Sequence, residues 1–316
     1  VLSRIEVFRG TGPVSGTSYT IKMGCKKDGT ITAAHANMVF QSGPYAGSMY
    51  FNAPNAMFTR YDIPNLDIVA YEVLSNRQKV ASFRAPCVPQ IVFGVEGVVD
   101  EMARKIEMDP IDFRMKNACE DGHTTIYGDT WGPIGFIETL KQAKESDHYK
   151  TPVKAGEGRG ISTGLWFNRG GETAASLNLA PDGTVTIAIG TADVAGSRIS
   201  ISMMAAEELG IPVDQVRVKM ADTNSLGFNR VTAGSRTTFS VGMVIVDSAR
   251  KCIAELRGRA AEMWDVPEDG VIFEDGMVRP ASANVGDFEP MSIADICKKT
   301  TMSHGAISGH TEMNVT

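Results

Sequence analysis

The chain has 316 residues, of which 43% are hydrophobic and 22% are charged, a composition typical of a globular protein. This length is sufficient for two compact domains, each with its own core. The net charge of −6 leaves no surplus of basic residues to meet phosphates, which argues against a nucleic-acid partner. No apolar run approaches the length that spans a bilayer, so no membrane association is expected.

The cysteines point to a reducing compartment. They are odd in number, dispersed, and without a C-x-x-C pair, which argues against a disulfide framework, an iron–sulfur cluster or a structural zinc site. The first residue is valine, and the opening residues do not have the pattern of a signal peptide. We therefore expect a cytoplasmic protein. The start at valine indicates either a processed subunit or a sequence excised from a longer chain. The cysteines are Cys25, Cys87, Cys119, Cys252 and Cys297.

Alternating polarity predicts strands in the first third of the chain. Residues 1–10 alternate, and residues 19–25 and 31–40 alternate on either side of Asp28-Gly29, a strong hairpin signal. Residues 42–64 are rich in glycine, proline and asparagine and predict a loop.

A strand over residues 67–74 precedes a helix over residues 91–106, in which apolar residues recur at helical spacing. Asp109-Pro110 disfavours continuation, so this helix should end at Met108. The polar and charged residues that follow predict a domain boundary, which we place between residues 150 and 151.

The second half mixes strands and helices without regular βαβ alternation. This predicts an α+β fold with mixed and antiparallel sheets and packed helices rather than a doubly wound sheet. The expected strands are 160–167, 174–179, 184–189 and 216–220, with a hairpin over 269–279. The expected helices are 197–209, a long one running from the end of TAGSRTT to about 263, and 293–299.

Four turn-rich loops stand at the ends of these elements, at residues 82–90, 167–173, 190–198 and 232–238. The last reads TAGSRTT, and its small residues allow backbone N–H groups to approach a polar ligand closely. An ordinary helix cap explains the same residues. Likewise, Arg84 in the first loop either contacts an anionic ligand or forms a salt bridge at a helix entry.

Hydrolytic and metal-binding constellations are not evident. The five histidines lack metal-ligand spacing, and no G-x-S-x-G elbow is present. Cys87 is either a nucleophile, as in a cysteine-dependent acyl-transfer enzyme, or a small hydrophobic residue beside prolines.

Taken in order, four stretches resemble the molybdenum-cofactor-binding large subunit of the xanthine dehydrogenase and aldehyde oxidase family of molybdenum hydroxylases. They are FRAPCVPQ at 83–90, MDPIDFRMKN at 108–117, AAEELGIPVDQVRV at 205–218 and DTNSLGFNRVTAGSRTTFSVG at 222–242. The resemblance implies that residues 1–150 and 151–316 are parts of a first and a second molybdenum-cofactor-binding domain.

The resemblance also implies a site. The residues carried over to cofactor binding are Arg84, Ala85, Pro86, Cys87, Gly196, Ser197, Ala233, Gly234, Ser235, Arg236, Thr237 and Thr238. Those carried over to the substrate pocket are Cys87, Phe167, Asn168 and Arg169. No protein ligand to molybdenum is expected, and the catalytic glutamate base of the family lies outside this chain.

Two departures from the family pattern concern this site. The third loop lacks the glutamine of the usual Gly-Gln-Gly, and Cys87 stands where glycine is usual.

The implied reaction hydroxylates an N-heterocycle or oxidises an aldehyde with oxygen from water. The implied cofactors are molybdopterin or its cytosine dinucleotide form, with iron–sulfur clusters and FAD on partner chains or domains. The implied partners are the rest of the large subunit, an iron–sulfur subunit, an FAD subunit and a small-molecule substrate. We expect the chain alone to be inactive. The alternative is a non-catalytic scaffold that retains the fold without the cofactor.

Overall fold

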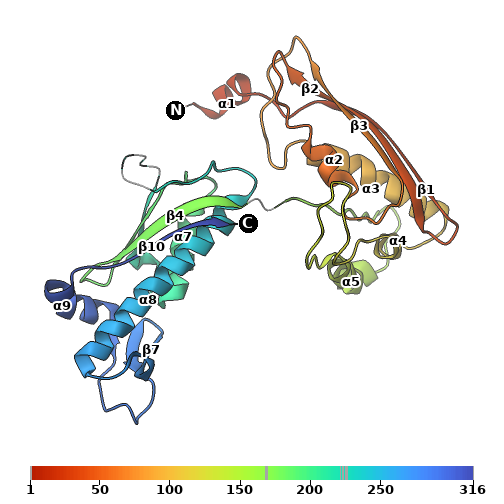
Figure 1. Ribbon diagram of the computed structural model, residues 1–316. Coiled ribbons are helices and arrows are strands. Elements are labelled where there is room, and N and C mark those ends of the chain that lie inside the picture. The colour runs from red at the N-terminus through yellow and green to blue at the C-terminus, as the bar shows by residue number, and fades with distance from the viewer. Residues whose placement is uncertain (1, 168–169, 221, 223, 225–226, 316) are drawn as a thin grey trace. The chain divides into compact units, whose positions relative to one another are not determined.

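The computed structural model describes residues 2–167, 170–220, 222, 224 and 227–315. It consists of two compact units, Val1–Trp166 and Phe167–Thr316, each built from helices packed on a sheet (Figure 1). The predicted α+β class is confirmed. The units divide between residues 166 and 167, whereas the sequence predicted a boundary between residues 150 and 151. Among the described residues, no helix is long and apolar enough to cross a membrane.

Unit 1 contains a three-stranded sheet in the order β1-β2-β3, formed by β1 (Thr17–Cys25), β2 (Ile31–Gly43) and β3 (Leu66–Leu74). β1 and β2 form the predicted hairpin, in which the Asp28 carboxylate accepts from the Thr30 amide and Gly29 adopts a φ of 88°. A left-handed φ of this kind favours glycine. β3 pairs in parallel with β2.

Helices cover one face of this sheet. α3 (Val88–Lys105) packs along it (Figure 1) and begins three residues before the predicted helix. Its apolar stripe enters the core with the inward residues of β2, as helical and strand periodicities require. α3 ends at Lys105, three residues before the predicted end at Met108, and Asp109 caps the next helix, α4 (Pro110–Lys116). The core residues from these elements are Ile91, Val95, Val99, Ala36, Met38 and Phe40.

Three local predictions in unit 1 are wrong or incomplete. Residues 4–10 form a helix, α1 (Arg4–Gly10), rather than a strand, because Ser3 and Glu6 make a capping box. The predicted loop over 42–64 contains α2 (Asn52–Met57). The polar region before the predicted boundary contains α5 (Phe136–Glu145) and α6 (Asp147–Lys150).

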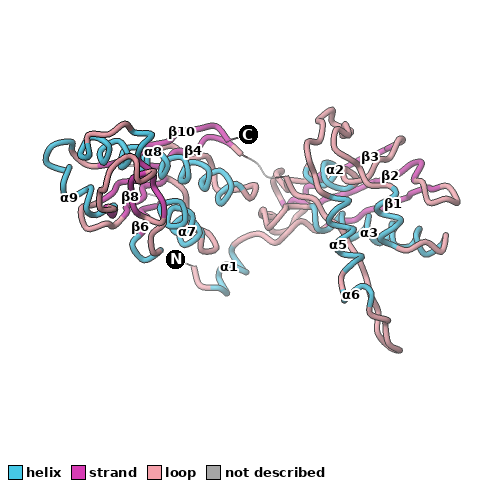
Figure 2. Tube along the Cα trace, turned by 90° about the horizontal axis from the view of Figure 1, so that it is seen from below, coloured by secondary structure: helices cyan, strands magenta, loops and turns pink. Residues whose placement is uncertain are grey.

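Unit 2 contains a four-stranded sheet in the order β10-β4-β5-β6. β4 pairs antiparallel with β5 and β10, whereas β5 and β6 are parallel and joined through α7. α8 packs along β4 and β10, and α7 packs beside it against β6 (Figure 1 and Figure 2). The bounds are β4 (Gly171–Leu179), β5 (Val185–Ile189), α7 (Ser197–Leu209), β6 (Val216–Met220), α8 (Gly242–Trp264) and β10 (Ile307–Val315).

Short elements complete unit 2. α8 is preceded by a π-helical turn, η2 (Thr237–Val241). The single-turn 3₁₀ helices η1 (Val213–Gln215) and η3 (Glu268–Gly270) precede β6 and β7. The small sheet β7-β8-β9 and helix α9 close the far end of α8, with bounds β7 (Val271–Glu274), β8 (Met277–Pro280), β9 (Met291–Ser292) and α9 (Ile293–His304).

The predicted strand over 160–167 is wrong, because residues 160–166 form no strand and attach instead to unit 1 through side chains described below. The sequence analysis also missed β10, which pairs with β4 more than 120 residues away along the chain. Such pairing leaves no local signal, since it depends on which edge of the sheet is free.

Gly309 gives a test of the packing of β10 on α8. A Cβ added there would lie 2.0 Å from the Ser248 carbonyl oxygen, so Gly309→Ala must separate the strand from the helix. We expect the free energy of unfolding in urea to fall by about 2 kcal/mol or more. The control is Gly258→Ala within α8, where the nearest atom is the flexible end of Glu268 at 3.3 Å. Helix propensity should make this change neutral or stabilising by up to about 1 kcal/mol. Equal losses in both variants would contradict the packing.

Candidate functional site

Three of the four predicted loops meet at one end of the unit 2 sheet. β5 and β6 are parallel and end together, with Ile189 opposite Met220, and β4 begins beside them because it runs the other way. β5 and β6 therefore end at the same edge of the sheet at which Gly171 begins β4, and residues 190–196 follow β5 there. Ligands of sheets with parallel strands bind at the carboxyl ends of those strands.

Hydrogen bonds connect these loops directly. The hydroxyls of Thr191 and Thr232 lie 3.0 Å apart and join the third loop to the fourth. The Arg230 amide donates to the Glu172 carbonyl at 3.0 Å, and the Asn229 side chain donates to the Ala174 carbonyl at 3.0 Å. The loops thus form one surface.

The TAGSRTT loop makes a tight turn at Gly234 and Ser235. Gly234 and Ser235 have φ values of 66° and 62°, and the left-handed value at Ser235 is strained for a residue with a Cβ. The turn runs into the π-helical residues Thr237–Val241, and π-helical turns are frequent at functional sites. Within the described part of the chain, the hydroxyls of Ser235, Thr237 and Thr238 accept and donate no hydrogen bond. They remain available to a ligand.

Arg236 points the other way. Its guanidinium donates to the carbonyl oxygens of residues 170, 171, 172 and 230 and to the Thr173 hydroxyl, and the residue is only 3% exposed. Burial lowers the pKa of Arg236, and the charge of Arg230 lowers it further. In this arrangement all three guanidinium nitrogens are already engaged, so the structure gives Arg236 a part in the loop itself.

In the third loop, an aspartate of the loop itself accepts hydrogen bonds from the start of α7. Asp193 accepts from the Arg198 amide at 3.1 Å and from its Nε at 3.2 Å, and the Ser197 hydroxyl donates to the Ala192 carbonyl at 3.3 Å. The backbone hydrogen bond from Arg198 is the main reason why the pKa of Asp193 is lowered. Its carboxylate therefore takes the place of an external anion at the start of α7. Gly196, with a φ of 80°, keeps its backbone exposed.

The second loop is only partly described. Phe167 and Gly170 lie in the described part, and Gly170 is held through its carbonyl by Arg236. The predicted pocket residues Asn168 and Arg169 lie outside the described residues.

The first loop belongs to unit 1 and precedes α3. Arg84 is exposed, and no described carboxylate lies within ion-pair distance of it, so the salt-bridge alternative is wrong. Ala85 and Cys87 have φ values of 51° and 69°. Glycine adopts such left-handed φ values without strain, whereas Ala85 and Cys87 each carry a Cβ there. Gln90 donates to the Ser15 carbonyl at 3.3 Å rather than facing outward.

Cys87 itself is inside the protein. It is 3% exposed, and its thiol donates to the Ser48 carbonyl at 3.1 Å. Burial, with a smaller contribution from the negative charge of Glu72, raises the pKa of Cys87 to about 11. A nucleophilic cysteine needs the opposite shift and an open approach. The structure therefore argues against the acyl-transfer alternative.

Two buried polar atoms lie beside this turn. Asn52 donates through its Nδ2 to the Pro86 carbonyl at 3.3 Å, but its Oδ1 has no hydrogen-bond partner among the described residues. The Ser48 hydroxyl is likewise buried and unpaired in the described structure. Buried polar atoms ordinarily have hydrogen-bond partners. These two unpaired atoms therefore make the surroundings of the turn polar, although they lie within the core of unit 1.

A buried charged cluster in unit 1 was not predicted from the sequence. Glu96 accepts from Arg60 at 2.5 Å, from Arg114 at 3.0 Å, from the Tyr61 hydroxyl at 2.8 Å and from the Thr163 amide at 2.8 Å. Burial alone would raise the pKa of Glu96, but the two arginines and these hydrogen bonds hold it below its ordinary value. Burial, reinforced by the Glu96 charge, raises the pKa of Tyr61 to about 12.

This cluster fixes the segment that leads to unit 2. The Thr163 hydroxyl accepts from Arg60 Nε at 2.8 Å, and the Ile161 carbonyl accepts from Arg114 at 3.1 Å. Residues 161–163 thereby become part of unit 1. The only sequence signal was a glutamate within the apolar stripe of a helix, where a charge requires a partner.

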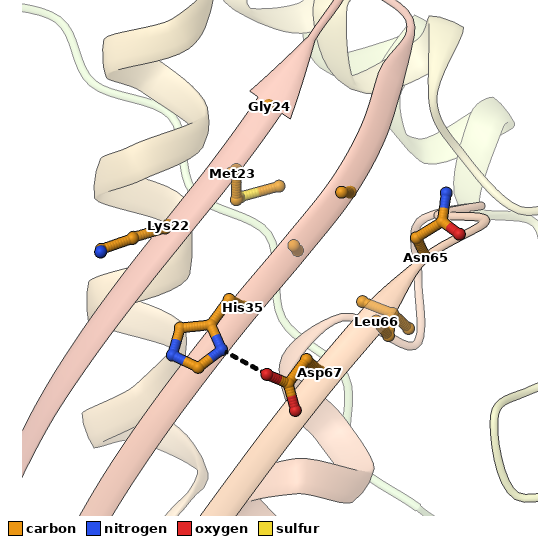
Figure 3. A pocket seen from close by; sticks show the side chains of 9 residues that line it. Lys22, Met23, Gly24, His35, Asn65, Leu66 and Asp67 are labelled. Carbon is orange, nitrogen blue, oxygen red and sulfur yellow. Dashed lines mark hydrogen bonds and ion pairs between the residues drawn. The ribbon is translucent and has the colours of Figure 1, made fainter.

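A shallow depression of about 330 Å³ lies on unit 1 over the starts of β2 and β3 and the end of β1 (Figure 3). His35 and Asp67 point toward one another across neighbouring strands, 2.8 Å apart, with Lys22 opposite His35 on β1. None of the predicted site residues lines it. No group of three or more metal-ligating side chains occurs in the described ranges.

Comparison with known proteins identifies the family. Models of a molybdopterin cofactor-binding domain match residues 1–118 and 137–315. The chain therefore belongs to the family of molybdopterin-binding large subunits of molybdenum hydroxylases, and the predicted resemblance is confirmed.

Several curated proteins are similar over most of this chain. The nicotine 6-hydroxylase large subunit of Paenarthrobacter nicotinovorans is 23% identical over 88% of this chain and 37% of its own length. The aldehyde oxidoreductase of Megalodesulfovibrio gigas is 27% identical over 74% of this chain and 28% of its own length. The chain thus spans less than two fifths of these relatives.

Solved structures share the fold. A Cu,Mo-dependent CO dehydrogenase superimposes with a TM-score of 0.79 at 20% identity, covering 95% of this chain and 43% of the other. Quinoline 2-oxidoreductase from Pseudomonas putida 86 gives a TM-score of 0.78 at 16% identity, covering 99% of this chain and 44% of the other.

The Glu96 cluster predicts a dependence of stability on pH. Because the pKa of Glu96 in the folded chain lies below its ordinary value of 4.5, the carboxylate stabilises the fold above pH 4.5. This contribution is lost as the pH falls through the folded pKa. Glu96→Gln should lower the free energy of unfolding by about 3 kcal/mol at pH 7, and by less between about pH 4 and pH 3. Urea titrations at each pH measure both effects.

The control is Glu101→Gln on the solvent side of the same helix. Glu101 pairs with Lys105 at 2.9 Å, but both side chains are more than half exposed. We expect no measurable loss of stability, because water screens an exposed pair. A Glu96→Gln variant as stable as this control would show that the cluster does not hold the fold.

Cys87 gives a second test. With a pKa of about 11, roughly one Cys87 thiol in a thousand is ionised at pH 8. Iodoacetamide should leave Cys87 unmodified in the folded chain and modify it in urea, as mass spectrometry of the peptides would show. Complete modification of the folded chain within minutes would restore the nucleophile hypothesis.

Proposed function

We propose that the end of the unit 2 sheet is a wall of the molybdenum-cofactor site of a hydroxylase that oxidises an N-heterocycle or an aldehyde with oxygen from water. The observation that carries the proposal is the meeting of three loops at the carboxyl ends of β5 and β6, where TAGSRTT presents its turn and its unpaired hydroxyls. Ala233, Gly234, Ser235, Thr237 and Thr238 are the residues that we assign to the cofactor.

The chemistry of these residues fits a pterin with a phosphate. Small residues allow the backbone to approach a planar ring, hydroxyls and amides donate to its polar edge, and the start of a long helix favours a phosphate. The fit is poorer at the third loop, because the Asp193 carboxylate repels an anion. We therefore assign the phosphate to Ser235 and Thr238 rather than to Ser197, and leave Gly196 as a backbone contact.

On unit 1 we assign the exposed Arg84 guanidinium to an anionic part of the cofactor or substrate, with Ala85 and Pro86 beside it. The strained turn at Ala85 and Cys87 and the unpaired Oδ1 of Asn52 support a polar ligand near this loop. Phe167 remains our proposal for substrate selection, together with Asn168 and Arg169 outside the described residues. Buried Cys87 would influence the substrate only through the shape of the turn that it stabilises. A bound molybdenum cofactor would supply the oxygen transfer and accept two electrons, and this chain would hold and orient it.

We further propose the context in which the chain works. The catalytic base, the remaining part of the large subunit, and iron–sulfur and FAD partners would come from outside these 316 residues, so the chain alone would not turn over. This proposal is supported by the small share of the relatives that the chain spans. The cofactor would be molybdopterin or its cytosine dinucleotide. The five unpaired cysteines support a cytoplasmic location.

Metal analysis tests the proposal. The full-length protein, purified with its partners, should contain about one molybdenum and one pterin per large subunit. Ala233→Leu should lower the molybdenum and pterin contents at least fivefold, because the larger side chain occupies the space in front of the wall. The thermal unfolding temperature of the cofactor-free protein should stay unchanged, since Ala233 is exposed. The control is Ala283→Leu, which changes another exposed alanine, in the loop after β8. Folded wild-type protein without molybdenum would show that the chain is a scaffold instead.

A further inference from the structure

Arg236 is buried within the very loop that is assigned to the cofactor. The side chain reaches past its own turn to the first residues of β4. Its Nε donates to the Gly170 carbonyl at 2.9 Å, and its Nη2 donates to the carbonyls of Gly171 and Glu172 at 3.0 Å each and to the Thr173 hydroxyl. Its Nη1 donates to the Arg230 carbonyl at 2.9 Å.

No carboxylate among the described residues forms an ion pair with this buried cation. The nearest acid, Glu172, lies beside the more exposed Arg230, at 3.7 Å from its Nη1. Four carbonyl dipoles and one hydroxyl stabilise the Arg236 charge instead. Joining two loops through a buried charge without a counter-ion costs more free energy than joining them through apolar packing. The advantage of the guanidinium is that its hydrogen bonds are directional, because its planar set of donors fixes the orientation of several carbonyls at once.

The carbonyls that Arg236 binds set the shape of the surrounding backbone. Because the carbonyls of residues 170–172 and 230 turn inward to the guanidinium, the second and fourth loops are held against one another. The left-handed residues Gly234 and Ser235 precede Arg236, and Ser235 is exposed whereas Gly234 is half-buried. The Thr191–Thr232 contact then extends this connection to the third loop.

We propose that Arg236 is a positioning residue, which holds the Thr232–Ser235 turn and the start of β4 as one preformed wall and does not itself bind the phosphate. This inference rests on the proposed function, because the wall is useful only if the cofactor lies against it. It corrects the assignment of Arg236 to the cofactor that the family resemblance implies.

A lysine distinguishes the two roles. If Arg236 contacted a phosphate, Arg236→Lys would keep a positive charge there and retain most of the cofactor, whereas Arg236→Met would lose it. If Arg236 positions the wall, Arg236→Lys should lose the cofactor as Arg236→Met does. One ammonium group cannot reach the acceptors on both sides of the planar guanidinium.

The experiment uses the full-length complex, with and without molybdate in the growth medium. In the molybdenum-free protein, hydrogen exchange of peptides covering residues 170–174 and 229–236 should become about tenfold faster in both variants. Peptides from β7 and β8 should not change. In the molybdenum-replete protein, molybdenum per large subunit should fall at least fivefold in both variants. Arg217→Lys, an exposed arginine on β6, is the matched control and should change neither quantity.

Two outcomes overturn the positioning role, and a third overturns the proposed function instead. Wild-type exchange together with retained molybdenum in Arg236→Lys would assign the residue to direct phosphate binding. Faster exchange throughout unit 2 would assign it to general stability. Wild-type protein without molybdenum would refute the proposed function, and the exchange data would still show whether Arg236 holds the loops. Thr173→Val removes one acceptor with less risk to folding and should accelerate exchange in the same peptides by about threefold.

Discussion

The parallel pairing of β5 with β6 is the constraint on which the site depends. Two strands that run the same way must be joined by a crossover, here α7, and both must end at the same edge. Because β4 is antiparallel to β5, its first residue arrives at that edge as well. Three loops that are separated by 20 to 65 residues along the chain therefore lie together, and the fold alone creates a polar surface at the start of two helices.

The charges at that edge are arranged in two different ways. At α7 the chain supplies its own anion, since Asp193 accepts from the first helical turn, and the turn is satisfied without a ligand. At α8 the cation, Arg236, is directed inward to carbonyls, and the hydroxyls of Ser235 and Thr238 face outward. α7 and α8 both begin near this edge of the sheet. The start of α7 is already hydrogen-bonded to Asp193, whereas the hydroxyls before α8 have no partner among the described residues. This difference decides where an anionic cofactor fits.

Unit 1 shows how a buried charge determines where a domain ends. Glu96 lies within the apolar stripe of α3, where it pairs with Arg60 and Arg114 and accepts a hydrogen bond from the Thr163 amide. The segment before residue 166 is consequently bound to unit 1, although its composition resembles a linker followed by a strand. The predicted boundary followed composition, but the division of the structure follows these hydrogen bonds.

The sequence by itself determined the periodic elements, such as α7 and β6, whose predicted bounds match the structure, and the hairpin turn at Asp28-Gly29. It also determined the family, because four ordered motifs carry that signal. Only the tertiary structure decided that β10 pairs with β4, that residues 160–166 form no strand, that Cys87 is buried, and that Arg236 turns inward. These features depend on partners far away along the chain. Local propensity records what a segment prefers, whereas pairing, burial and charge compensation depend on which groups the fold brings within a few ångströms.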